Sequence, residues 1–79
     1  MNSELDKVLK EFRFYTNVIN KLGLLIKENQ LTLEHFPGGF KLGDIKTLNQ
    51  SKALIDYIGV SKPDECRFID NNTIRLWWD

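Results

Sequence analysis

The stretch that decides the fold is residues 66–79, CRFIDNNTIRLWWD, which carries both tryptophans close to the end of the sequence. Apolar and polar residues alternate on either side of a short Asp-Asn-Asn segment, which is the pattern of a β-hairpin. Two large rings at this place need cover, either from the protein's own core or from a partner. The sequence therefore predicts an ordered hairpin here rather than a frayed tail.

Two pairing registers compete in this hairpin. A two-residue loop over residues 71–72 places Arg67 among the isoleucines, whereas a three-residue loop with Asn72 left-handed pairs Phe68 with Ile74. We favour the three-residue loop because a slip of one residue would move the whole apolar set to solvent. Its inner face consists of Cys66, Phe68, Ile74, Leu76 and Trp78. Its outer face consists of Arg67, Ile69, Arg75 and Trp77.

An amphipathic helix is predicted near the N-terminus. Apolar residues recur there at spacings of three and four, at Leu5, Val8, Phe12, Tyr15, Ile19 and Leu22. Gly23 either ends this helix as a left-handed cap or lies inside a helix that continues to about Lys27. We favour the longer helix because Ile26 continues the apolar face, although residues 24–27 would also suit a short strand.

The middle of the chain predicts a second hairpin and a second helix. Residues 31–45 contain Pro37-Gly38, a pair suited to the centre of a turn, and pairing around it sets Glu34 opposite Lys41. Thr47 and Gln50 form a capping box that opens a helix closed by Gly59. The residues expected to point inward from this helix are Leu48, Leu54, Ile55 and Ile58.

The resulting order is α-β-β-α-β-β. We expect a small single α+β domain over residues 1–79, with an antiparallel sheet of about four strands and two helices packed on one of its faces.

Composition narrows the class of protein. The chain is 42% hydrophobic, which argues against disorder. Eleven basic and eleven acidic residues cancel, so the overall field does not steer the protein toward nucleic acid or anionic lipid. The single cysteine, the polar first residues and the lack of a long apolar run indicate a cytoplasmic protein with no membrane association.

Residues that carry chemistry are sparse. Cys66 and His35 are the only cysteine and histidine, and the predicted registers place them on different hairpins, so a nucleophilic pair is not expected. Two such ligands do not make a zinc site, and the Pro-Gly-Gly-Phe turn at residues 37–40 does not match a phosphate-binding loop. We therefore predict no catalytic residues, no metal, no cofactor and no enzymatic activity.

Two surfaces are candidates for partner binding. On the last hairpin, Arg67, Arg75 and Trp77 share the outer face, and Trp and Arg are the residue types most enriched at interface hot spots. On the first helix, Phe14 and Val18 lie opposite the core stripe within a basic surround, which is typical of a protein-binding face or of a homodimer seam along that helix. Each surface also has an interpretation without a partner. Trp77 would be buried in the core, and Phe14 and Val18 would be scattered surface apolar residues.

These features favour a non-enzymatic protein-interaction module. We expect a small inhibitor or adaptor that docks on a larger protein, a class to which many phage- and plasmid-encoded proteins belong. The alternative is a small nucleic-acid-binding protein that uses the face of the C-terminal hairpin, because strand aromatics beside arginines can stack bases.

Overall fold

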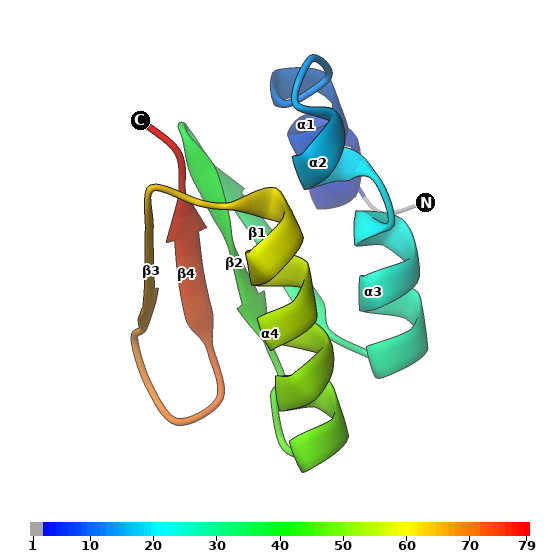
Figure 1. Cartoon of the computed structure of the whole chain (residues 1–79), viewed down its shortest axis with the longest axis vertical. Coiled ribbons are helices and arrows are strands. Elements are labelled where there is room, and N and C mark those ends of the chain that lie inside the picture. The colour runs from blue at the N-terminus through cyan, green and yellow to red at the C-terminus, as the bar shows by residue number, and fades with distance from the viewer. Residues whose placement is uncertain (1–2) are drawn as a thin grey trace.

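The computed structural model describes residues 3–79 as a four-stranded antiparallel sheet with helices gathered on one of its faces (Figure 1). The strands lie in the order β1-β2-β4-β3. The helices are α1 (Ser3–Glu11), α2 (Thr16–Ile19), α3 (Leu22–Asn29) and α4 (Leu48–Ser61). The strands are β1 (Thr32–Phe36), β2 (Gly39–Gly43), β3 (Glu65–Phe68) and β4 (Ile74–Trp77). The predicted α+β class, its antiparallel sheet and its order of elements are confirmed, except that three helices replace the first one.

The first predicted helix is broken at residues 12–15 and at residues 20–21. A straight helix over residues 3–27 would be about 38 Å long, longer than the 30 Å greatest extent of the molecule. The breaks let α1 lie beside β1 while α3 packs against α4. Lys21, with φ of 68°, makes the second turn, and Gly23 lies inside α3. Residues 24–27 are therefore helical, as we favoured.

The first hairpin has the predicted register. Glu34 pairs with Lys41, and Gly38 occupies the turn with φ of 89°. Gly39 follows at a point of close approach, because a Cβ there would lie 2.1 Å from the carbonyl oxygen of Leu76 on β4. Its lack of a side chain allows β2 and β4 to pair.

The second hairpin also has the register that we favoured, with Phe68 opposite Ile74. The prediction that Asn72 is left-handed was wrong, because its φ is not positive. Instead the Asn72 N–H donates to Oδ1 of Asp70 at 2.7 Å, so a side chain closes the turn.

Helix α4 begins with the predicted capping box but continues two residues beyond Gly59, to a left-handed Lys62. Its inward face differs from the prediction. Leu54 is buried, but Leu48 and Ile55 are 70% and 67% exposed. Nothing in the described chain covers these two side chains.

The core lies between the helices and the inner face of β2 and β4. Its largest fully buried side chains are Phe40, Leu22, Leu42, Leu76, Val8 and Val18. Trp78 closes one end of the core. Its ring centroid lies 5.1 Å from that of Phe12 and 5.4 Å from that of Phe40. Its indole N–H donates to the carbonyl oxygen of Ser61 at 3.0 Å. The protein's own core therefore covers this ring.

Candidate interaction surface

The outer face of the sheet is the surface that the helices leave uncovered (Figure 1). Alternation along each strand sends one set of side chains into the core and the other set to this face. The set that reaches the outer face includes Glu34, Phe36, Lys41, Glu65, Arg67, Arg75 and Trp77. The sheet thus presents aromatic and charged side chains together on one side.

Arg75 joins two aromatic rings on this face. Its guanidinium carbon lies 4.2 Å from the ring centroid of Trp77 and 4.6 Å from that of Phe36 on β1. These three residues, which we name the aromatic-arginine cluster, span β1 and β4. Gly39 on the intervening strand β2 is paired with both Phe36 and Trp77, and its missing side chain leaves room for the rings to approach. Cation–π attraction therefore stabilises a half-exposed cluster rather than a buried one.

Charge on the face follows the register. Lys41, Arg75 and Arg67 are consecutive neighbours across β2, β4 and β3, so the two arginines that were predicted to share this face lie opposite one another. Glu34 continues the same row on β1, and Glu65 stands in the adjacent row. The row places a band of positive charge beside the rings, with Glu34 at its β1 end and Glu65 in the row next to it. Stacking over the rings accommodates Arg75 without an anion.

Phe14 and Val18, the second candidate pair, do not form one surface. Phe14 is 82% exposed, and the Arg13 guanidinium lies 4.9 Å from its ring centroid. Val18 is 1% exposed, because the break at residues 12–15 turns α2 toward α4. There the Tyr57 hydroxyl donates to the Val18 carbonyl oxygen at 2.6 Å. The expectation that Val18 offers its side chain to a partner, or to a homodimer seam with Phe14, was wrong.

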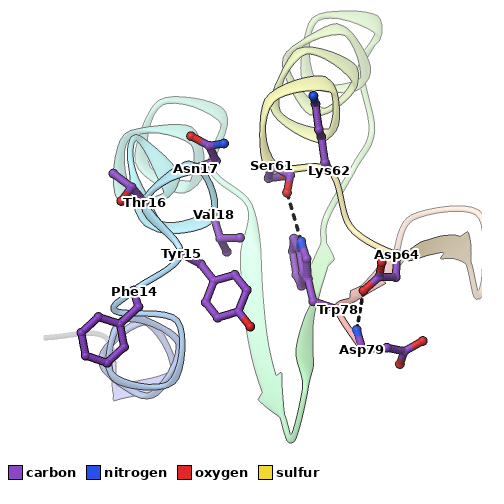
Figure 2. A pocket seen from close by; sticks show the side chains of 10 residues that line it. All are labelled: Phe14, Tyr15, Thr16, Asn17, Val18, Ser61, Lys62, Asp64, Trp78 and Asp79. Carbon is purple, nitrogen blue, oxygen red and sulfur yellow. Dashed lines mark hydrogen bonds between the residues drawn. The ribbon is translucent and has the colours of Figure 1, made fainter.

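A surface hollow of about 480 Å³ opens beside Phe14, between the α1–α2 connection and the end of β4 (Figure 2). Figure 2 shows Tyr15 directed across this hollow, with Trp78 and Asp79 on its other side. The Asp79 N–H donates to Oδ2 of Asp64 at 2.5 Å, which fixes that rim. The helical periodicity that predicted one straight helix gave no signal for this hollow, because the hollow exists only where the helix breaks.

A second hollow, of about 500 Å³, lies between α3 and α4. Leu24 and Val60 on its lining are 56% and 57% exposed, and Tyr57 lies deeper. Burial raises the pKa of the Tyr57 hydroxyl. A neutral, hydrogen-bonded phenol at this place is a structural group that ties α4 to α2. The sequence did not single out Tyr57 as a core residue.

His35 and Cys66 lie apart, on different hairpins, as the predicted registers placed them. His35 on β1 and Cys66 on β3 stand at opposite edges of the sheet, three strand spacings apart, which is about 14 Å. Cys66 is exposed rather than buried as its inner-face position suggested. Within residues 3–79, no three His, Cys, Asp or Glu side chains gather in a way that could hold a metal ion. No helix over the same residues is long and apolar enough to cross a membrane.

Comparison of the chain with protein-family models, with curated proteins and with solved structures gives no significant match. Function is therefore argued from the geometry of the surface.

Proposed function

We propose that the protein is a non-enzymatic interaction module, a small intracellular inhibitor or adaptor that docks the outer face of its sheet onto a larger protein. The observation that carries this proposal is the aromatic-arginine cluster of Phe36, Arg75 and Trp77 on an uncovered sheet. Rigid strands hold the two rings and the guanidinium in place before a partner arrives. Docking then orders few side chains, which lowers the entropic cost of binding.

The chemistry of the cluster indicates the chemistry of its partner. The rings offer apolar area, and the Arg75 guanidinium that lies over them carries N–H donors. Among the described residues, no carboxylate forms an ion pair with Arg75. A partner that presents a carboxylate surrounded by apolar side chains would fill both needs. Arginine binds carboxylates in two-pronged geometry, and such anchors dominate interface energetics.

Binding of single-stranded nucleic acid is a second candidate, because Lys41, Arg75 and Arg67 form a continuous cationic row beside two rings. Two observations rank it lower. Arg75 already occupies the faces of both rings, so a base would have to displace it before stacking. Glu34 ends the row on β1 and Glu65 stands in the row next to it, and both would repel a polyanion.

Affinity capture tests the proposal. The wild-type protein would be immobilised and exposed to lysate of the cells that express it, with and without nuclease, and bound proteins would be identified by mass spectrometry. Arg75→Ala and Trp77→Ala remove the cluster, while Lys52→Ala removes an exposed cation of α4 as a matched control. We expect one stoichiometric protein that survives nuclease and is retained by Lys52→Ala but lost with either cluster variant.

Salt dependence separates the two candidates. Fluorescence anisotropy with labelled single-stranded DNA and RNA would be measured between 50 and 200 mM salt, a range over which affinity for a polyanion falls steeply, by about 10³-fold or more for six phosphate contacts. Tight, steeply salt-dependent binding that is lost with Arg67→Ala and Trp77→Ala would replace the protein-docking proposal with the nucleic-acid one. A captured protein that binds both cluster variants as well as wild type would also refute docking through this face.

A further inference from the structure

The two edges of the sheet differ. At one edge, α1 lies beside β1, and the outward His35 N–H donates to Oε1 of Glu4 at 2.9 Å. Glu11 accepts from the Gly38 N–H at 2.8 Å in the adjoining turn. At the other edge all residues of β3 are exposed. Helix α1 therefore blocks β1, whereas β3 presents an unpaired strand.

The register fixes which groups β3 presents. Ile69 donates its N–H to the carbonyl oxygen of Thr73. Hydrogen-bonded positions alternate along an antiparallel ladder, so Arg67 and Glu65 face β4 in the same way. The N–H and C=O groups of Cys66 and Phe68 consequently point away from β4. Over residues 3–79 they meet no hydrogen-bond partner, which is the arrangement that accepts another strand.

We propose that a second copy of this chain pairs with β3, edge to edge and antiparallel, so that two sheets join into one. The pairing is centred on Cys66, which lies opposite Cys66 of the second copy. Glu65 then lies opposite Arg67 of the second copy, and Arg67 opposite its Glu65. This centre uses the outward N–H and C=O groups in hydrogen-bonded pairs, as the alternation requires.

Charge selects this partner and this register. Neither Glu65 nor Arg67 forms an ion pair among residues 3–79. The register centred on Cys66 gives them two oppositely charged cross-strand pairs, which are favourable. Moving the centre by one residue would set Arg67 against its own copy, which is unfavourable for like charges. The sequence Glu65-Cys66-Arg67 is therefore complementary to itself when reversed.

The inner face of the new junction is apolar. Cys66 and Phe68 point to the helical side of the sheet, and Phe68 is 55% exposed there. In the pair, the Cys66 side chains of the two copies adjoin one another, and each Phe68 is a diagonal neighbour of the other copy's Cys66. The junction is much smaller than the roughly 20–30 residues per side of a standard interface, so we expect a weak, transient dimer.

Charge exchange tests the proposal. Arg67→Glu places Glu opposite Glu, and Glu65→Arg places Arg opposite Arg, so either variant alone should raise the dimer dissociation constant about tenfold or more. An equimolar mixture of the two variants restores both opposite-charge pairs and should dimerise like wild type. Lys52→Glu, on α4, makes the same change in net charge as Arg67→Glu and should leave the constant unchanged. Circular dichroism first shows that each protein is folded. Sedimentation equilibrium under reducing conditions then measures the dimer dissociation constant of wild type, of the three variants and of the mixture.

A second readout locates the contact. The Cα atoms of a hydrogen-bonded antiparallel pair lie about 5.5 Å apart, within the range that a disulfide spans. Diamide, which takes two electrons and two protons from a pair of thiols, should therefore cross-link wild type and the mixture faster than either variant alone. A wild type that stays monomeric to about 1 mM overturns the proposal. So does a dimer that is indifferent to both variants, or variants that fail to recover on mixing.

Discussion

Replacing Trp78 with alanine should lower the free energy of unfolding by about 3 kcal/mol. A fully buried tryptophan replaced by alanine costs about 3–5 kcal/mol, and Trp78 is only partly buried, which places it at the low end. Its ring packs against Phe12 and Phe40, and its N–H holds the carbonyl oxygen of Ser61 at the end of α4. A domain of this length is stable by about 4–12 kcal/mol in total, so the loss is a large share.

Trp77→Ala is the matched control one residue away. The Trp77 ring is half-exposed on the outer face and contacts Arg75, so its removal should cost only about 1 kcal/mol. Trp78→Phe keeps a ring in the core but loses the hydrogen bond to Ser61, and it should also cost about 1 kcal/mol. The order of stability is then wild type, followed by these two variants together, followed by Trp78→Ala.

Urea denaturation followed by far-ultraviolet circular dichroism measures the three variants without relying on tryptophan emission. Trp78→Ala should also lower Tm by about 12–24 °C, at 4–8 °C per kcal/mol for a domain of this size. The midpoints should shift at constant m. If Trp77→Ala cost as much as Trp78→Ala, or Trp78→Ala cost less than about 1 kcal/mol, the assignment of the two rings to opposite faces would be refuted.

Three further substitutions test other contacts. Tyr57→Phe removes the buried hydroxyl that binds the backbone of α2, and it should destabilise by about 1–2 kcal/mol in urea denaturation; no change would mean that the bond is not formed. Gly39→Ala forces a Cβ against the Leu76 carbonyl oxygen, and it should destabilise by about 2 kcal/mol or more; a neutral result would refute the close approach. The Glu4 carboxylate accepts a hydrogen bond from the Lys7 ammonium and another from a β1 N–H, and these hold its pKa below the ordinary 4.5. The ionised carboxylate therefore contributes stability above pH 4.5, and this stability is lost as the pH falls through the lowered pKa. Glu4→Gln should therefore be less stable than wild type at pH 7, and the two should converge in denaturation curves recorded toward pH 3.

Both hairpins were predictable because their apolar residues alternate and only one register keeps each set on one face. The register of Phe68 with Ile74 followed from that rule alone, as did the turn at Gly38. The capping box at Thr47 was similarly local, since its two partners are three residues apart. Local rules suffice where the interacting groups are neighbours in the sequence or across one turn.

Predictions failed where distant parts of the chain compete for the same space. The 3.6-residue periodicity of the first helix continues through residues 12–15 with no glycine or proline to mark a break, yet the molecule is too short for one straight helix. Val18 therefore changes from a solvent-facing position to a buried one. Ile55 was misassigned in the opposite direction, because the apolar pattern within α4 does not reveal which of its apolar residues the rest of the chain covers.

The candidate site was found in part. Arg67, Arg75 and Trp77 share a face as predicted, since that follows from register. Phe36 was missed, because it belongs to the other hairpin and joins the cluster only through the pairing of β2 with β4. Gly39 gave the available signal, as a small residue in a strand often marks a place where neighbouring side chains or backbones converge.

Two carboxylates of α1, Glu4 and Glu11, limit the number of copies of this chain that can join edge to edge. A sheet with two bare edges is a bifunctional monomer that can add copies without end, as fibrils do. Glu4 accepts from a backbone N–H of β1, and Glu11 accepts from one in the turn beside it. This chain therefore has one free sheet edge, β3, and pairing of two copies uses it. Assembly then terminates at two copies. Detachment of α1 would free the β1 edge as well. The same short helix that completes the core therefore also decides whether the protein forms a dimer or a polymer.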